Sequence, residues 1–311
     1  MSSQQLKLIA IGLAVLLLLW GGSELLSHGS DSVTGTLALP ALKPADVDTI
    51  RLVKGADSIL LVKRPPPPPD EWSVNGHRVR KDAVDELLLL LRDSARPEVV
   101  AQDTSSFARL GVDSAGGRWL WVHGGTKGSL TLIVGTRGHD YQSTYLRRPG
   151  DPHVYLWRGG LANLADRSVD DWRDKRIAVL QPDSITAIDV VRGKDRYTLQ
   201  RTGKKWTMKG GSAVDSAAVG RMLDRLKTVT AAGFATAKDV DSTKAVRAAR
   251  RLAVRGAHGM LLSLVFDSIP SAFLVHHLAG TGGEGTTVYR MNSWDLDGLT
   301  PTSRSLLPPK K

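Results

Sequence analysis

Residues 280–285 are the stretch of this sequence that most resembles a ligand-binding motif. They fit the letter pattern G-x-G-x-x-G, which binds a pyrophosphate only where a helix follows and directs its N-terminal amides at the phosphates. Residues 286–290 are instead rich in β-branched residues, so we predict a strand preceded by a flexible hairpin loop. The sequence also lacks a Gly-Lys-Ser/Thr phosphate-binding loop, so the chain is not expected to be a transporter ATPase.

Eight histidines raise the question of a metal site. His276 and His277 are adjacent in a predicted strand, where successive side chains point to opposite faces and cannot easily share one ion. His139 and Asp140 lie together in a predicted turn, but no histidine completes their site at a recognised spacing. We therefore predict no metal ion and no other cofactor.

Candidates for nucleophilic or acid–base catalysis are equally sparse. The sequence contains no cysteine and no Gly-x-Ser-x-Gly motif, which excludes thiolate chemistry, disulfides and the serine elbow of hydrolases. Asp170 and Asp171 are adjacent and diverge on a helix, whereas the spacing from Ser168 to Asp171 predicts an N-terminal capping box. The chain is therefore interpreted as non-enzymatic, with no catalytic residue. A hydrolase of envelope polymer is the alternative if separated strands bring carboxylates into one cleft.

Charge is the global feature that indicates a partner. The formal net charge is +11, and residues 184–311 hold 20 basic and 10 acidic side chains, which leaves only +1 for residues 1–183. Within this basic half, residues 244–252 have the spacing of a helix that Ser242 would cap. The predicted cationic face consists of Lys244, Arg247 and Arg251, and the opposite face of Ala245, Ala248, Ala249 and Leu252.

The patch formed by Lys244, Arg247 and Arg251 is our candidate site for an anionic partner. Basic patches commonly bind nucleic acid, but the bulk of the chain is predicted to lie outside the cytoplasm, so no nucleic acid is expected. Lipid headgroups, anionic envelope polymers and acidic protein surfaces are the partners that this charge would find there. A basic face that contacts only solvent is the alternative.

The predicted location rests on residues 1–28. Lys7 precedes an uninterrupted apolar run from Leu8 to Trp20, and the first acidic residue is Glu24. A helix over this stretch, with the Lys7 side chain extended toward the interface, is long enough for one membrane span. Because the positive charge precedes the run, we expect a single-pass protein of the inner (cytoplasmic) membrane with the bulk of the chain outside the cytoplasm. A cleaved signal peptide is the alternative.

The rest of the chain contains one order of elements twice. In each half three short strands precede a helix, with strands predicted at 47–53, 58–63 and 71–74 and again at 185–191, 197–201 and 205–208. Trp72 and Trp206 occupy the same place in the two copies and are expected to pack in the cores. Residues 109–112 are likewise echoed by residues 251–254. Residues 65–69 are all proline, which predicts either an extended solvated loop or a stiff rod for a partner.

Two copies with so long a period indicate duplicated domains with a boundary near Asp183. The predicted fold class is α+β, with an N-terminal transmembrane helix followed by two tandem α+β repeats whose sheets are mainly antiparallel. The predicted domains are a membrane anchor at 1–28, a linker at 29–44, repeat 1 at 45–183 and repeat 2 at 184–311.

Several of these features together resemble a bacterial membrane-anchored family of unknown function that is often carried beside gliding-motility-type ABC transporter genes. They are the N-terminal anchor, the strand-strand-Trp-strand-helix opening, and residues 107–111, 154–155 and 172–175. The second copy departs from the pattern at Ala253, where the first has Gly111. The resemblance implies an auxiliary protein or binding partner of an ABC-type export or motility assembly, with the transporter permease or another envelope protein as its partner. It carries over no functional residue. A periplasmic ligand-binding or sensor module is a further alternative, which would need a concave pocket between the repeats.

Overall fold

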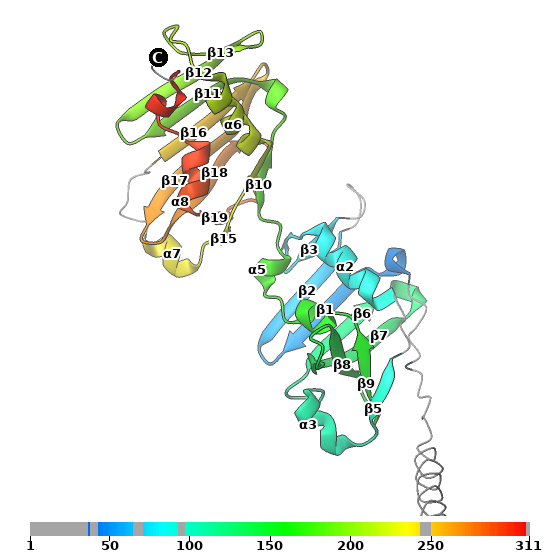
Figure 1. Ribbon diagram of the computed structural model, residues 1–311. Helices are drawn as coiled ribbons and strands as arrows, with labels where there is room; N and C mark the ends of the chain where they lie inside the picture. Colours follow the sequence, from blue (N-terminus) through cyan, green and yellow to red (C-terminus); the bar gives the residue numbers. More distant parts are fainter. Residues whose placement is uncertain (1–36, 38–42, 65–70, 93–96, 243–249, 309–311) are drawn as a thin grey trace, which may run out of the picture.

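The computed structural model describes residues 37, 43–64, 71–92, 97–242 and 250–308. Its strands form a nine-stranded sheet, an eight-stranded sheet and a two-stranded sheet. Figure 1 shows the two large sheets in separate halves of the molecule. We call the half that contains the nine-stranded sheet unit 1 and the other half unit 2.

The nine-stranded sheet of unit 1 has the strand order β4-β3-β2-β1-β6-β7-β8-β9-β5. Its strands are β1 (Thr49–Lys54), β2 (Asp57–Lys63), β3 (Trp72–Val74), β4 (His77–Arg78), β5 (Glu98–Ala101), β6 (Arg118–His123), β7 (Ser129–Arg137), β8 (Ser143–Arg147) and β9 (Val154–Arg158). In β1, Ile50 and Leu52 are buried while Arg51 is exposed, because successive side chains on a strand point to opposite faces. The tight turn from β1 to β2 uses Gly55 at a φ of 58°, a left-handed conformation that favours glycine.

The helices of unit 1 cover mainly one face of this sheet. They are α2 (Lys81–Arg92), α3 (Phe107–Leu110), α4 (Leu161–Ala165) and α5 (Val169–Trp172), with short 3₁₀ turns η1 (Pro44–Asp46), η2 (Thr104–Ser106) and η3 (Gly125–Lys127). Leu87 of α2 and Leu164 of α4 pack into the core with the inward residues of β1 and β6. Leu110 of α3 packs instead with Ile133 in a smaller cluster.

The eight-stranded sheet of unit 2 has the order β13-β12-β11-β16-β17-β18-β19-β15. Its strands are β11 (Ile185–Arg192), β12 (Asp195–Thr202), β13 (Lys205–Met208), β15 (Gly233–Phe234), β16 (Arg250–Gly256), β17 (Gly259–Ile269), β18 (Ala272–Gly280) and β19 (Val288–Met291). Helices α6 (Ser216–Lys227) and α8 (Ser293–Leu299) lie over one face of this sheet (Figure 1). Val219 and Met222 of α6 and Leu296 of α8 are buried in its core. The remaining helices are α7 (Ala237–Ser242) and the 3₁₀ turn η5 (Ser303–Leu306).

The two large sheets share a strand order. Apart from the edge strand β4, the order β3-β2-β1-β6-β7-β8-β9-β5 in unit 1 corresponds to β13-β12-β11-β16-β17-β18-β19-β15 in unit 2. Leu120 of β6 lies between Leu52 and Leu132. Leu252 of β16 lies in the same way between Val190 and Leu264. Both leucines are fully buried, so they occupy matching core positions.

A short connector, residues 168–184, joins the units, and its helix α5 also packs on the core of unit 1. Helix α5 leads into β10 (Arg176–Val179), which pairs with β14 (Thr228–Thr230) of unit 2, and the 3₁₀ turn η4 (Pro182–Ser184) then leads into β11. At its other end the connector pairs with unit 1 through a bridge between Val79 and Arg173. The backbone N–H of Arg80 also donates to the Trp172 carbonyl at 2.8 Å. Backbone hydrogen bonds therefore tie the connector to both units.

The predicted fold class is wrong. Instead of a transmembrane helix followed by two α+β repeats, the described chain is mostly antiparallel sheet with short helices. In the part of the chain that the structure describes, no helix is both long enough and apolar enough to cross a membrane. The predicted anchor at 1–28, most of the linker at 29–44 and the proline run at 65–69 lie outside the described residues. The alternation of buried and half-buried residues through β17 is the strand signal that the α+β interpretation underweighted.

Of the shorter sequence patterns, some correspond to the structure and one does not. Residues 109–112 and 251–254 do not form equivalent elements, because the first set ends α3 at a left-handed Gly111 and the second lies within β16. Trp72 and Trp206 pack against the cores of unit 1 and unit 2, as expected, but they are only half-buried and lie at the margins of these cores. The capping box is also confirmed, because Ser168 and Asp171 bond reciprocally at the start of α5.

Candidate functional site

The part of the predicted cationic patch that the structure describes does not lie on a helix. Lys244 and Arg247 lie outside the described residues, and Ser242 is the last residue of α7. Arg251 lies in β16, a strand paired on both sides. In β16, Leu252 and Val254 are buried and Arg251 and Arg255 are exposed. This two-residue alternation is the signal that the helical interpretation of 244–252 missed.

Arg251 belongs instead to a basic surface on the face of the sheet opposite α6 and α8. Val191 of β11 is its direct cross-strand neighbour, and Arg196 of β12 lies directly opposite Val191. The two arginines therefore flank one valine on the same sheet face. Arg255 also lies on this face and forms an ion pair with Asp189. We call Arg196, Arg251 and Arg255 the basic sheet face.

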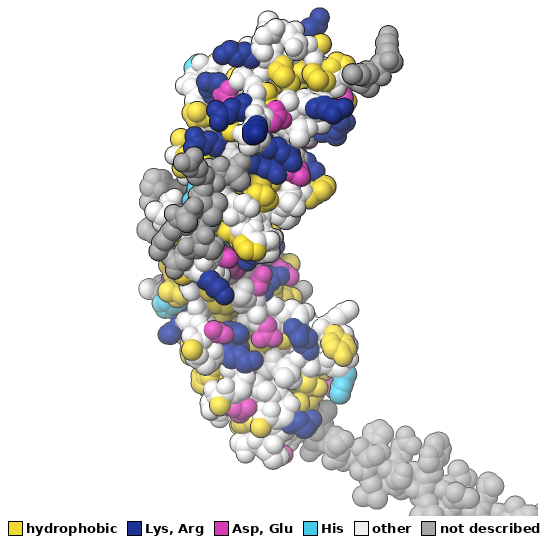
Figure 2. Space-filling model, turned by 90° about the vertical axis from the view of Figure 1, so that its left-hand side faces the viewer, with side chains coloured by type: hydrophobic (Ala, Val, Ile, Leu, Met, Phe, Trp, Pro, Cys, Tyr) yellow, Lys and Arg dark blue, Asp and Glu magenta, His cyan; other side chains and the backbone are white. Residues whose placement is uncertain are grey.

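The charges of the basic sheet face are only partly neutralised. Among the described residues, neither Arg196 nor Arg251 has an acidic partner within ion-pair distance, and both are exposed. A cavity of about 380 Å³ adjoins this face and is lined by Asp189, Arg196, Thr198 and Lys209, among others. Figure 2 shows Lys and Arg side chains spread over unit 2, whereas acidic and basic side chains are more evenly mixed over unit 1.

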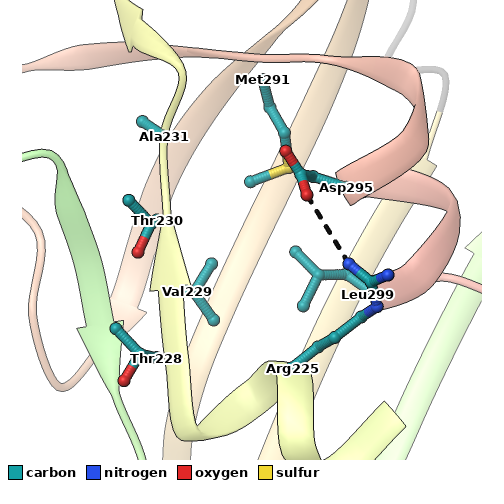
Figure 3. A pocket seen from close by; sticks show the side chains of 8 residues that line it. All are labelled: Arg225, Thr228, Val229, Thr230, Ala231, Met291, Asp295 and Leu299. Carbon is teal, nitrogen blue, oxygen red and sulfur yellow. Dashed lines mark ion pairs between the residues drawn. The ribbon is translucent and has the colours of Figure 1, made fainter. Parts of the chain in front are cut away.

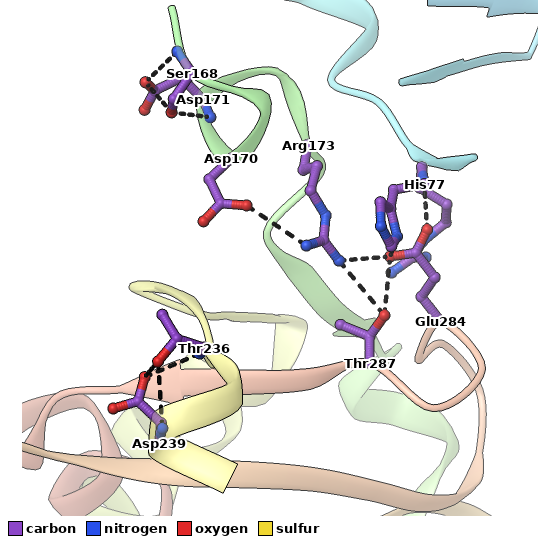
Figure 4. Close-up of polar contacts among 10 residues, drawn as sticks. His77, Ser168, Asp170, Asp171, Arg173, Thr236, Asp239, Glu284 and Thr287 are labelled. Carbon is purple, nitrogen blue, oxygen red and sulfur yellow. Dashed lines mark hydrogen bonds and ion pairs between the residues drawn. The ribbon is translucent and has the colours of Figure 1, made fainter. Parts of the chain in front are cut away.

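A second polar site lies where the units meet, and Arg173 is at its centre (Figure 4). Arg173 is only 8% exposed, and its guanidinium carbon lies 3.4 Å from the centroid of the Phe234 ring in β15. Its Nη2 atom lies 3.3 Å from a carboxylate oxygen of Glu284, and Nη1 lies 3.5 Å from one of Asp170. The buried cation therefore has both an aromatic face and two acidic partners.

Glu284 connects unit 2 to unit 1. Its carboxylate accepts from the backbone N–H of Arg78 in β4 and lies 3.6 Å from His77 Nδ1. Thr287 donates to the same carboxylate at 3.4 Å. The loop between β18 and β19 that carries Glu284 is the one predicted from the glycine pattern at 280–285, so a hairpin loop is confirmed there. Sequence reasoning missed its contact with unit 1, although Glu284 is the only acidic residue between Asp267 and Asp295.

Asp174 completes the connector. Its carboxylate accepts two-pronged hydrogen bonds from the Arg176 guanidinium at 2.8 and 3.0 Å. Burial opposes ionisation of Asp174, but the bonds from the Arg176 side chain and backbone outweigh it and hold the pKa of Asp174 below its ordinary value. The Asp174 backbone N–H donates to the Arg78 carbonyl at 2.9 Å, so this ionised carboxylate is fixed against unit 1.

Two cavities adjoin the connector. One of about 570 Å³ is lined by Arg80, Lys81, Asp82, Asp174, Lys175, Arg176 and Thr230. The other, of about 270 Å³, is lined by Arg64, Glu71, Trp72, Arg78, Val79, Lys81, Asp174 and Arg176. The larger cavity has walls from unit 1, the connector and β14 of unit 2.

A smaller cavity of about 170 Å³ lies within unit 2, between β14 and α8 (Figure 3). Arg225 and Asp295 line it and form an ion pair at 3.6 Å. The Arg225 guanidinium carbon also lies 4.1 Å from the centroid of Trp294, which is 70% exposed. One balanced ion pair gives this cavity no excess charge for an anionic partner.

The absence of a metal site stays a prediction. Within the described residues, no group of three or more His, Asp or Glu side chains lies close enough to hold a metal ion. His276 lies 3.1 Å from Asp267, and the backbone N–H groups of Gln142 and Ser143 donate to Asp140 in the predicted turn.

An Asp–His pair that sequence reasoning missed precedes β9. His153 Nδ1 lies 2.7 Å from Asp151, and the Tyr155 hydroxyl donates to Asp151 at 2.9 Å. Burial and this hydrogen bond raise the pKa of Tyr155 to about 12, so its hydroxyl stays protonated at neutral pH. In the described part of the chain, His153 has no serine or threonine hydroxyl as a hydrogen-bond partner. The group therefore lacks the nucleophile of an acyl-transfer triad.

Comparison with curated proteins finds no match, and comparison with solved structures finds none either. Residues 72–248, more than half of the chain, match the model of a protein family whose description is a domain of unknown function (DUF4340). The matched range begins in β3 of unit 1 and ends after α7 of unit 2. It therefore includes the connector and Arg173.

Proposed function

The chain belongs to the family described as a domain of unknown function (DUF4340), and from that premise we propose that it is a non-enzymatic binding protein. Its basic sheet face binds an acidic protein surface of an ABC-type export or motility assembly, with the transporter permease as the leading partner. This link to a transporter rests on the family resemblance of the sequence and not on the family match.

The observation that supports binding is that Arg196 and Arg251 lack counter-charges. Both are exposed on a paired, rigid sheet and have no acidic partner among the described residues. Arginine presents a planar fork of donors that fits a carboxylate in two-pronged fashion. A partner that brings carboxylates to this face would supply the missing counter-charges.

The apolar residues of the same face favour a protein over a lipid headgroup layer or a charged polymer. Val191 and Val265 are the two cross-strand neighbours of Arg251, and both are half-buried. Interfaces between proteins combine arginines with apolar contact area, and a few such residues dominate the binding energy. Valines beside the arginines add this contact area.

Location is part of the proposal. The apolar run from Leu8 to Trp20 with Lys7 before it supports a protein held at the cytoplasmic membrane with its bulk on the outer side. Membrane fractionation with alkaline carbonate, followed by protease treatment of spheroplasts, tests this. Recovery in the membrane fraction with a protease-accessible C-terminus is expected. A soluble protein, or one protected from protease, would contradict the proposed location.

The binding proposal is tested by reversing the charge of the two unpaired arginines. The double variant Arg196→Glu, Arg251→Glu is purified by affinity from detergent-solubilised membranes, and the co-purifying ABC-type permease is quantified. Recovery is expected to fall about tenfold or more, which corresponds to about 1.4 kcal/mol of binding free energy. The matched control is Arg64→Glu, Lys175→Glu, which reverses the charge of two cations away from this face. Equal recovery with the charge-reversed variant and the wild type would refute the role of the face.

A further inference from the structure

The cavities beside the connector carry an inference that goes beyond protein binding. We propose that they form one binding groove for a small polyanion, a molecule with phosphate or carboxylate groups at two separated positions. Ligand sites occur preferentially at domain interfaces and commonly have volumes of about 300–1,000 Å³. The cavities of about 570 and 270 Å³ adjoin each other, because Lys81, Asp174 and Arg176 line both.

The charge of the groove selects an anion. Six cationic side chains line it, namely Arg64, Arg78, Arg80, Lys81, Lys175 and Arg176, against the acidic side chains of Glu71, Asp82 and Asp174. Two of these acids are already neutralised within the groove, since Asp82 pairs with Arg80 at 2.5 Å and Asp174 with Arg176 at 2.8 Å. The remaining cations exceed the remaining acid, Glu71.

Three of those cations form no close ion pair. In the described parts of the chain, Arg64, Arg78 and Lys175 form no ion pair. Arg64 lines only the smaller cavity and Lys175 only the larger one. The uncompensated charge is therefore distributed along the groove, which fits a ligand with two anionic ends better than a single ion.

The groove is also held in place before a ligand arrives. Arg78 donates from Nη2 to the Arg176 carbonyl at 2.7 Å. The backbone N–H of Asp174 donates to the Arg78 carbonyl at 2.9 Å, and that of Arg80 donates to the Trp172 carbonyl at 2.8 Å. Preformed donors reduce the ordering that binding would otherwise require. Because the larger cavity has walls from both units, a ligand in it also stabilises the junction between them.

Calorimetric titration and thermal unfolding of the full chain test this inference, with tripolyphosphate and citrate as probes and sodium chloride at matched ionic strength as the blank. We expect at least one probe to bind and to raise the melting temperature above the blank. Binding of tripolyphosphate alone assigns a phosphate ligand, and binding of citrate alone a carboxylate ligand. Absence of binding by both probes overturns the proposal.

Paired variants locate the site. The double variant Arg64→Gln, Lys175→Gln should weaken probe binding about tenfold or more without lowering the melting temperature of the free protein. The control Arg109→Gln, Lys127→Gln changes two exposed cations outside both proposed sites and should bind the probe as the wild type does. Equal weakening in both variants would show a nonspecific charge effect and overturn the proposal. The variant Arg64→Gln, Lys175→Gln should still recover the permease as the wild type does, because the two sites use different residues. Failure of the polyanion site can therefore be distinguished from failure of the proposed function.

Discussion

Arg173 and Glu284 are the single side chains that we expect to contribute most to the stability of the junction between the units. The Arg173 guanidinium is buried between Phe234 and Glu284, whereas its other partner, Asp170, has a side chain that is 54% exposed. We expect Glu284→Gln to lower the free energy of unfolding by about 1.5–3 kcal/mol, because it leaves a buried charge without its main partner. Asp170→Asn should change it by less than about 1 kcal/mol, since an exposed ion pair contributes little.

A double-mutant cycle checks that this loss belongs to the pair. Urea unfolding of Arg173→Met, Glu284→Gln and the combined variant should give a coupling energy of about 0.5–3 kcal/mol, the range found for residues in contact. If the two single effects add without coupling, or if Asp170→Asn costs as much as Glu284→Gln, the contact between Arg173 and Glu284 does not stabilise the junction.

Asp174 gives the junction a pH dependence whose sign follows from its lowered pKa. Because burial is outweighed by the Arg176 hydrogen bonds, the folded state binds a proton on Asp174 less readily than the unfolded state does. Its contribution to stability is therefore present above the unfolded pKa of about 3.9 and is lost as pH falls through the lower folded value. Asp174→Asn should lower stability at pH 7 and make its decline below about pH 4 shallower. Urea unfolding at a series of pH values tests this, and an unchanged slope would contradict it.

At the scale of elements, the start of α5 depends on a local motif. The Ser168 hydroxyl donates to Asp171 at 2.7 Å and accepts from the Asp171 backbone N–H at 3.3 Å. These bonds, led by the one from the Ser168 side chain, hold the pKa of Asp171 below its ordinary value. Ser168→Ala should lower the free energy of unfolding by about 1 kcal/mol, the usual value of an N-cap.

The matched control for this change is Ser168→Thr, which keeps the hydroxyl. It should retain most of the stability, as measured by urea unfolding, because threonine also caps helices. Equal losses for alanine and threonine would attribute the effect to packing and not to the cap.

At the scale of the molecule, the two units have separate hydrophobic cores joined by a polar junction. Domains joined by a small polar interface need not unfold in one transition. Leu120→Ala and Leu252→Ala remove matching core side chains, one in each unit. Each should destabilise its own unit by about 2–5 kcal/mol and lower one transition far more than the other.

Calorimetry and tryptophan fluorescence distinguish the two transitions. Trp157 and Trp172 are buried in the core of unit 1, whereas Trp206 and Trp294 lie in unit 2. Leu120→Ala should therefore shift the transition that Trp157 and Trp172 report. A single transition that both substitutions lower equally would show that the units unfold as one.

Local order was readable from the sequence because it depends on neighbours in the chain. The Ser168 and Asp171 spacing alone determined the capping box, since it needs only short-range hydrogen bonds. The strands predicted at 47–53 and 58–63 likewise correspond to β1 and β2, which are joined by a tight turn at the left-handed Gly55. The recurrence of Trp72 as Trp206 also indicated corresponding strands, and β3 and β13 have corresponding positions in the two sheets.

Contacts between distant residues were decided only by tertiary structure. Arg251 reads as helical beside its alanine neighbours, but pairing with β11 and β17 places it in a strand, because strand formation depends on partners far away in the sequence. Glu284 reads as a polar residue of a glycine-rich loop, and only the packing of unit 2 against the connector brings it to Arg173, 111 residues away. Charge is a property of composition, whereas the surface that presents it depends on which strands pair.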